Sequence, residues 1–389
     1  MFRVCKTEEV LDICHGLLMN FFRVERNTSM LMVAAAFVGL IWANSPFWTG
    51  LDEFRNFTLG AGPVSFTLEG WVTNFGIPVF FFLVGLELKR ELTDGVLREK
   101  SAILVPGLAA VFGVVVPAAF FLLVTAGNPD ATAGWPIPTA TDVTFSLAVL
   151  MIFGSRLPKV ARTFLLSFAV IDDLIAIGII TVLFMGDPNL LDLAYAVAFT
   201  TAFAFITKIQ ASGAALWALR SLSMAFAGLA LYNTVVSGMQ ASVVGLILGL
   251  LVPANSAKKL QELLHPWVAV LVLPLFALFA VGVNLGNINV FGQPVFWAIL
   301  TRPLGKFTGV YAGGTLGKKL SGQFAELDWK TLAKVSVLAG IGFTISLLVA
   351  NLTFALQPAM LISAVTATLI ATLVSSILGA LALVRAHRT

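Results

Sequence analysis

Two adjacent aspartates, Asp172 and Asp173, lie in the middle of an apolar run that extends from Phe168 to Ile180. Together with its apolar neighbours this run is long enough to cross a membrane as a helix. An ionised aspartate at the centre of a membrane helix costs about 2.5–3.5 kcal/mol on insertion scales. Carboxylates at that depth are typical of ion and proton pathways. The pair therefore predicts that the protein moves a cation or a proton.

A third aspartate, Asp142, directly follows a sequence that interrupts another apolar run. That sequence, 136–141, holds two prolines and two threonines, and a second interruption at 339–344 holds two glycines. Proline removes a helical hydrogen-bond donor and glycine weakens a helix, so both predict unwound backbone at membrane depth. Hard cations take oxygen ligands, which carboxylates, hydroxyls and unwound carbonyls supply. We expect Asp142 and Asp173 to form an open cation site with Thr141 beside it.

The partner of Asp172 follows from helix geometry. Adjacent residues on a helix point about 100° apart, so Asp172 and Asp173 face different surroundings. Arg302 and Lys306 are strong charges within one predicted span, four residues apart and on one helical face. A buried carboxylate requires a cation close to it. We expect Asp172 to pair with Arg302, and Lys306 to extend along its apolar stem so that its ammonium group reaches the membrane surface.

The composition is that of an all-α polytopic membrane protein. The chain has 389 residues, of which 58% are hydrophobic and 11% charged, against about 25% charged in soluble domains. The apolar runs are too long for barrel strands and leave room for about twelve helices. The expected spans are 29–44, 71–88, 101–124, 135–152, 160–184, 190–207, 213–232, 237–252, 264–283, 291–312, 331–350 and 359–384. Residues 28–385 thus form a single membrane domain.

The segment before that domain, 1–27, has apolar residues at helical spacing and charges on the other face. It predicts an amphipathic helix on the cytoplasmic membrane surface. Its cysteines, Cys5 and Cys14, indicate neither a metal site nor a disulfide framework. The net charge of +4 gives no sign of a nucleic-acid partner, since basic residues concentrate in alternate loops and Arg55 stands almost alone in the others. This distribution places both termini in the cytoplasm.

Two further patterns concern symmetry and assembly. Each interrupted run is the middle member of a three-helix group, spans 3–5 and 10–12, and these groups start on opposite sides of the membrane. Paired interruptions of this kind predict inverted repeats around a midplane ion site.

In the outer loop, about 56–68, two short β-type runs flank a Gly-Ala-Gly-Pro turn. They predict a hairpin whose edge can pair with a second copy of the chain, although an ordinary ordered loop is equally compatible.

Five motifs resemble those of the NhaA-type sodium/proton antiporters. They are Phe81-Phe82-Leu83-Val84-Gly85-Leu86-Glu87-Leu88-Lys89-Arg90-Glu91-Leu92, Thr139-Ala140-Thr141-Asp142, Ala169-Val170-Ile171-Asp172-Asp173-Leu174, Leu264-His265-Pro266-Trp267-Val268 and Gly340-Ile341-Gly342-Phe343-Thr344. The resemblance extends from about residue 25 to 385. It implies twelve helices with crossed, broken helices 4 and 11. It also implies electrogenic, pH-regulated exchange of sodium or lithium for protons in a bacterial inner membrane, without a cofactor.

The resemblance also assigns roles to individual residues. Asp142 and Asp173 would bind the cation, and Asp172 would be the paired aspartate. Glu87 and Glu91 would belong to a cytoplasmic pH-responsive region. The outer hairpin would be the contact of a homodimer within the lipid bilayer.

The chain departs from the family pattern at three positions. Arg302 stands where the best-known members carry a lysine that some accounts make a proton carrier, and arginine keeps its proton in proteins. If this alignment holds, the protons must move on Asp172, Asp173 or Asp142, or Lys306 has taken over. The residues expected to set proton coupling are thus Asp172, Asp173 and the altered position Arg302. Gln240 and Asn74 replace a histidine and an acidic residue. These changes bear on stoichiometry and on the pH threshold, and they leave the cation site intact.

Two other functions need weighing. An intramembrane aspartyl protease also uses two membrane aspartates, but they must converge on one water molecule, usually with a Gly-x-Gly-Asp motif. The chain contains no such motif, and Asp172 and Asp173 diverge. A sodium-coupled symporter of a small organic solute would need a larger polar pocket than these apolar spans suggest. Proton counter-flow on addition of sodium separates an antiporter from both.

Overall fold

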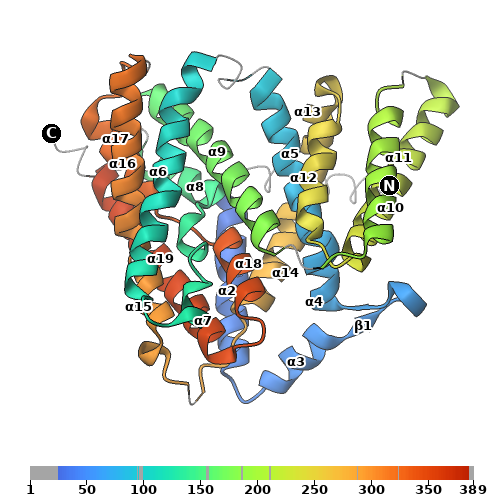
Figure 1. Ribbon diagram of the computed structural model, residues 1–389, viewed down its shortest axis with the longest axis horizontal. Helices are drawn as coiled ribbons and strands as arrows, with labels where there is room; N and C mark the ends of the chain where they lie inside the picture. Colours follow the sequence, from blue (N-terminus) through green and yellow to red (C-terminus); the bar gives the residue numbers. More distant parts are fainter. Residues whose placement is uncertain are drawn as a thin grey trace, which may run out of the picture.

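The structure is a computed structural model that describes residues 25–93, 95, 100–154, 157–184, 187–209, 212–286, 288–322 and 324–384. The predicted amphipathic segment 1–27, apart from its last three residues, lies outside the described residues, as do Cys5 and Cys14. The described chain is almost entirely helical (Figure 1).

The elements follow one another as a series of long and broken helices. In chain order they are α2 (Glu25–Ala43), α3 (Trp48–Asn56), β1 (Thr58–Leu59), η1 (Gly62–Val64), β2 (Phe66–Thr67), α4 (Leu68–Trp71), η2 (Val72–Gly76), α5 (Ile77–Thr93), α6 (Lys100–Val124), α7 (Pro129–Thr132), η4 (Ile137–Thr139), α8 (Val143–Phe153), α9 (Lys159–Leu183), α10 (Leu190–Ile206), α11 (Gly213–Val236), α12 (Ala241–Leu251), α13 (Ala254–Trp267), η5 (Val268–Val272), α14 (Leu273–Val281), η6 (Val290–Gly292), α15 (Pro294–Leu300), α16 (Arg302–Ser321), α17 (Trp329–Leu338), α18 (Thr344–Thr353) and α19 (Pro358–Val384). Of these, η2 and η5 are π-helical and continue directly into α5 and α14.

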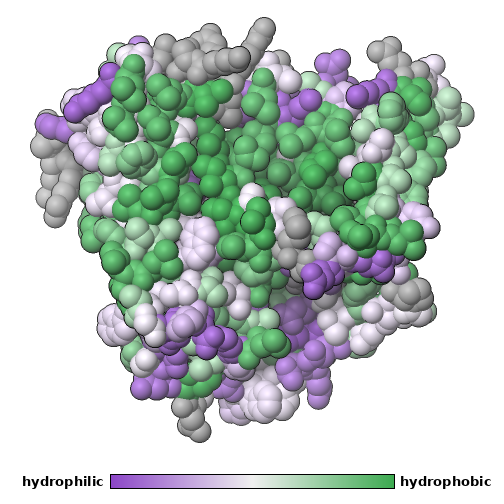
Figure 2. All heavy atoms as spheres, in the orientation of Figure 1, coloured by the Kyte–Doolittle hydropathy of each residue, from purple (hydrophilic) through white to green (hydrophobic). Residues whose placement is uncertain are grey.

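The predicted class, an all-α polytopic membrane protein, is confirmed. Among the described residues six helical segments are long and apolar enough to span a membrane, or eight if two bent pairs are each counted as one span. Figure 2 shows a broad hydrophobic band across the face in view, with hydrophilic side chains gathered above and below it. Every predicted span coincides with helix, but α10, α12 and α18 are short, so twelve spans remain a prediction.

Both predicted interruptions are present, and they lie against each other. One separates η4 from α8 and the other separates α17 from α18. The backbone amide of Asp142 donates to the carbonyl oxygen of Ile341 at 2.7 Å. The Ser146 hydroxyl donates to the Leu338 carbonyl at 2.9 Å, and the Ser346 hydroxyl to the Ile137 carbonyl at 2.8 Å. Each break therefore satisfies backbone groups that the other leaves without helical partners.

Helices α6 and α16, the first long helices of the two predicted three-helix groups, pack extensively against each other. Four glycines recur every four residues along the contacting face of α16, namely Gly305, Gly309, Gly313 and Gly317. A methyl group on Gly305 would come within 2.8 Å of the Pro117 Cα atom in α6, and one on Gly317 within 2.7 Å of the Val105 Cα atom. Small residues at this spacing let two membrane helices touch through their backbones. We call this contact the glycine seam.

The outer hairpin forms as two short antiparallel strands. Thr58 lies opposite Thr67, and Leu59 lies opposite Phe66. Figure 1 shows this hairpin projecting beyond α4 and away from the helical body. Its place on the outer side of the membrane, and its pairing with a second copy, remain predictions.

Candidate functional site

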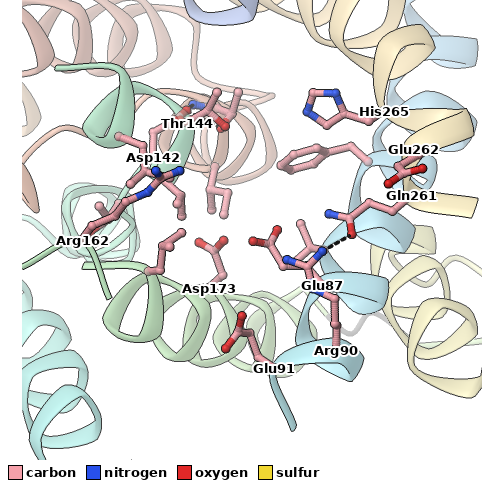
Figure 3. A pocket seen from close by; sticks show the side chains of 18 of the residues that line it. Glu87, Arg90, Glu91, Asp142, Thr144, Arg162, Asp173, Gln261, Glu262 and His265 are labelled. Carbon is pink, nitrogen blue, oxygen red and sulfur yellow. Dashed lines mark hydrogen bonds between the residues drawn. The ribbon is translucent and has the colours of Figure 1, made fainter. Parts of the chain in front are cut away.

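A cavity of about 450 Å³ opens beside the two breaks. Helices α5, α8, α9, α13 and α18 line it, with acidic and basic side chains among apolar ones. Its charged or titratable lining residues are Glu87, Arg90, Glu91, Asp142, Arg162, Asp173, Lys258, Glu262 and His265. Figure 3 shows Asp173 of α9 and Glu87 of α5 pointing into this space. We call it the inner cavity, because its lining includes Arg90, Arg162 and Lys258, which the positive-inside pattern predicts to lie on the cytoplasmic side.

Asp142 caps two half-helices at once. It is the N-cap residue of α8, and its Oδ1 atom accepts a hydrogen bond from the Phe145 amide at 3.2 Å. Its Oδ2 atom accepts bonds from the Thr344 amide at 3.2 Å and from the Thr344 hydroxyl at 2.7 Å, at the start of α18. Helix N-termini carry partial positive charge and stabilise a carboxylate. Asp142 is thereby held beside the inner cavity with both helix ends directed at it.

Asp173 has free capacity to bind a ligand. Its residue is 7% exposed, and among the described residues no hydrogen-bond donor reaches its Oδ1 atom. A buried carboxylate oxygen without a partner is unusual and costly. Asp173, Asp142 and Thr141 all line the inner cavity, so the structure brings together the three residues expected to form the cation site.

Thr141 links the two breaks. Its hydroxyl donates to the Ala339 carbonyl at 2.9 Å, and its backbone amide donates to Asp172 Oδ2 at 3.1 Å. The oxygen lone pairs of the hydroxyl remain available for a cation, because this hydrogen bond uses only the proton.

The expected pairing of Asp172 with Arg302 is wrong. Asp172 instead receives the Lys306 ammonium group, with Nζ at 2.8 Å from each carboxylate oxygen. Both side chains are fully buried. Lys306 therefore does not extend to the membrane surface as expected, and its Nζ lies 5.6 Å from the ring centroid of Phe168. Four residues separate the two cations by about 6 Å along α16, and Lys306 is the one level with Asp172.

Arg302 braces the second break instead. Its guanidinium donates to the Ser346 hydroxyl at 3.4 Å, to the Thr368 carbonyl at 3.2 Å and to the Thr372 hydroxyl at 2.7 Å. The Thr372 hydroxyl in turn lies 2.5 Å from the carbonyl oxygen of Gly342, within the unwound segment. Arg302 is fully buried. It thus joins α16 and α19 to the α17–α18 break through a fixed fork of donors.

Both residues expected to respond to pH lie in the inner cavity. Glu87 and Glu91 line the inner cavity, where neighbouring Arg90 lies 3.4 Å from the side-chain oxygen of Gln261. Of the two replaced family positions, neither Asn74 nor Gln240 belongs to the described lining of this cavity. Asn74 lies in η2, and Gln240 immediately precedes α12.

Sequence reasoning missed Thr344, whose amide and hydroxyl groups donate hydrogen bonds to Asp142. The signal was available, because Thr344 is the first residue after a Gly-x-Gly-Phe break and so must begin a half-helix. No local sequence pattern indicated that Lys306 would pair with Asp172.

Within the described ranges no group of three or more His, Cys, Asp or Glu residues could hold a resident metal ion.

Comparison with known proteins gives consistent matches along the chain. The family model described as Na+/H+ antiporter 1 matches residues 19–383. Na(+)/H(+) antiporter NhaA 2 of Clavibacter michiganensis subsp. michiganensis is 42% identical over 345 residues, covering 86% of this chain and 84% of the relative. Na(+)/H(+) antiporter NhaA 1 of Klebsiella pneumoniae subsp. pneumoniae is 34% identical over 389 residues, covering 94% of this chain and 95% of the relative.

A solved structure shares the fold. The sodium proton antiporter MjNhaP1 from Methanocaldococcus jannaschii aligns with a TM-score of 0.56 at 16% identity, covering 96% of this chain and 100% of that one. The curated relatives are transporters rather than enzymes, which excludes the aspartyl protease. Given a family match over nearly its whole length, the chain is an integral membrane protein that belongs to the Na+/H+ antiporter 1 family.

Proposed function

We propose that the protein exchanges sodium or lithium ions for protons across the cytoplasmic membrane. The observation that carries this proposal is the partnerless Oδ1 atom of Asp173, which lines the same cavity as Asp142 and Thr141. Two carboxylates and a hydroxyl are the oxygen donors that a small hard cation prefers. The names of the related proteins support sodium and protons as the exchanged ions.

Transport follows from competition between protons and one cation for the same carboxylates. When Asp142 and Asp173 release protons into alkaline cytoplasm, they gain the negative charge that binds sodium or lithium. An empty, doubly charged site is too costly to bury, so only loaded states change their accessibility. On the outer side, protons displace the cation. Two protons exchanged for one univalent cation move net charge, which makes the exchange electrogenic.

The paired residues divide the coupling roles. Asp172 is held by Lys306, which can exchange its proton, whereas Arg302 cannot lose its own. We therefore assign Arg302 to coupling as a fixed positive charge that holds the second break. Asp142 and Asp173 are the carboxylates that exchange protons for the cation, and Asp172 takes part in coupling through the proton of its partner Lys306. Glu87 and Glu91 face the cavity and regulate the exchange by pH through their charge.

The membrane arrangement completes the proposal. Twelve spans with both termini cytoplasmic place the inner cavity on the cytoplasmic side of a bacterial inner membrane. The contact between the two breaks supports inverted repeats that cross at the ion site. The projecting hairpin offers the strand edge Thr58–Leu59 to a second copy, so the transporter is a homodimer.

The test is the Asp173→Asn variant in everted membrane vesicles that carry a preformed pH gradient. We expect sodium or lithium to dissipate this gradient with the wild type and not with the variant. Asp130→Asn changes an exposed carboxylate outside the cavity and should behave as the wild type. Normal sodium-induced dissipation by Asp173→Asn would refute the site. Sodium uptake without proton counter-flow would indicate the symporter instead.

A further inference from the structure

A second cavity of about 350 Å³ lies toward the end of α18 that is farther from the break. Its polar lining comes from Thr67, Glu69, Thr73, Asn74 and Asn351, and the remaining lining is Gly70, Val72, Phe276, Phe279, Ala280, Leu348 and Leu352. We call it the outer cavity. Thr344 and Ile345 of α18 line the inner cavity, whereas Leu348 lines the outer one. From Ile345 to Leu348 is about one helical turn, so a thin layer of α18 separates the two spaces.

The same two spans line both cavities. The first is the continuous helix α4–η2–α5, and the second is α13–η5–α14. Their inner parts, α5 and α13, supply Glu87 and Lys258 to the inner cavity. Their outer parts supply Glu69 and Phe276 to the outer cavity. If these spans bend between their inner and outer parts, the width of the inner cavity changes relative to that of the outer cavity.

Each span contains a π-helical segment between these parts. The segments are Val72–Gly76 and Val268–Val272, each five residues long. They contact each other, and a methyl group on Gly76 would come within 3.0 Å of Val272 Cγ1. In both spans a proline follows at the second residue of the next helix, Pro78 and Pro274. Proline cannot donate to the carbonyl four residues earlier, which here lies inside the π segment. Such segments are where helices bend and are frequent at functional sites.

Polar contacts join the two spans on either side of these segments. On the outer side, the Arg55 guanidinium donates to the carbonyls of Phe279 and Gly282, at 2.7 and 3.0 Å, and pairs with Glu69 at 3.6 Å. On the inner side, Arg90 of α5 donates to Gln261 of α13 at 3.4 Å (Figure 3). Each pair of half-spans is therefore linked at its far end and able to bend in the middle.

We propose that the paired π segments are the hinge of the access change. The inner parts of the two spans swing about Val72–Gly76 and Val268–Val272 and close the inner cavity. The outer parts move with Arg55 and Glu69, so the outer cavity gains access to the ion site past α18. The outer cavity is then the side on which the cation leaves. This inference rests on the proposed exchange and adds the element that moves.

The first measurement uses reagent access to single cysteines in an otherwise wild-type protein with Cys5 and Cys14 changed to serine. Thr73→Cys reports on the outer cavity and Lys258→Cys on the inner one. The probe is a membrane-impermeant methanethiosulfonate, with sodium varied at alkaline pH. We expect sodium to change the two modification rates in opposite directions. Rates that move together, or an outer rate that stays constant while exchange proceeds, would overturn the hinge.

The second measurement stiffens the hinge. In Pro78→Ala with Pro274→Ala, each span regains a backbone donor, and bending must break the restored bond. We expect the exchange rate to fall by about thirtyfold, the equivalent of roughly two backbone hydrogen bonds, one in each span, with the sodium KM nearly unchanged. Pro106→Ala removes a proline inside α6, away from any π segment, and should leave the rate unchanged. A double variant that exchanges at the wild-type rate refutes the hinge, whereas a wild type without sodium-driven proton release refutes the exchange itself.

Discussion

Removal of Lys306 should destabilise the protein strongly, because it leaves Asp172 buried without a cation. Asp172 loses both bonds from Nζ and keeps the bond from the Thr141 amide at 3.1 Å. Breaking one side of a buried ion pair costs about 3–5 kcal/mol, most of it from the unpaired charge that remains. We expect a loss of this size for Lys306→Met, which nearly preserves the length of the side chain.

A second substitution that restores stability to Lys306→Met tests the ion pair more sharply than the loss of stability alone. Asp172→Asn removes the charge while its carbonyl oxygen still accepts from the Thr141 amide. Combined with Lys306→Met, it should recover most of the stability, since replacing both partners of a buried pair by neutral groups is often close to neutral. The control is Arg302→Met combined with Asp172→Asn. Because Arg302 bonds to Ser346, Thr368 and Thr372, that combination should be no more stable than the sum of its parts predicts.

The assay is the denaturant dependence of folding in detergent, measured for the wild type, the single variants and both doubles. The coupling energy between Lys306 and Asp172 should be at least about 2 kcal/mol, and that between Arg302 and Asp172 within about 0.5 kcal/mol of zero. If Arg302, and not Lys306, couples to Asp172, the ion pair described above is incorrect. Our assignment of Arg302 to the α17–α18 break, through its bonds to Ser346, Thr368 and Thr372, would then also be wrong.

Three other outcomes follow from the same geometry. Arg302→Lys should leave the reversal potential in proteoliposomes unchanged, yet lower stability by roughly 1–3 kcal/mol, because lysine cannot reproduce the three bonds. Glu87→Gln removes a negative charge facing Asp173, so protons leave more readily; the activity profile should shift to lower pH by less than about one unit, and a shift to higher pH contradicts this. Gly313→Ala places a methyl group against the Leu108 carbonyl and should lower stability by about 1–3 kcal/mol, whereas Gly178→Ala, which faces open space, should not.

Sequence patterns predicted the features that depend on local chemistry. Composition predicted the helical membrane class, because a soluble protein needs far more charged residues on its surface than the 11% found here. Pro136, Pro138 and the paired glycines at 340 and 342 predicted both breaks, since backbone preference acts over a few residues. The placement of Asp142 at a helix start, and hence in the inner cavity, followed directly from the first break.

Sequence patterns could not predict features that depend on how far one helix is shifted along its axis relative to its neighbour. Arg302 and Lys306 share a face of α16, and only the packing against α9 decides which of them is level with Asp172. The spacing of 134 residues between Lys306 and Asp172 contains no local signal. The π segments were also missed, although Pro78 and Pro274 mark them, because proline alone does not distinguish a kink from a π turn.

The glycine seam has a consequence for how this gene can change. A single base change in a glycine codon that alters the residue always adds at least a Cβ atom or ends the chain. At Gly309 and Gly313 that atom would meet the backbone carbonyls of Phe112 and Leu108, which cannot turn aside as a side chain can. At Gly178 the same mutation meets nothing within 4 Å. A library of random variants selected for growth in sodium should therefore retain almost no substitutions at the glycines along this one face of α16, whereas small replacements should persist at Gly178.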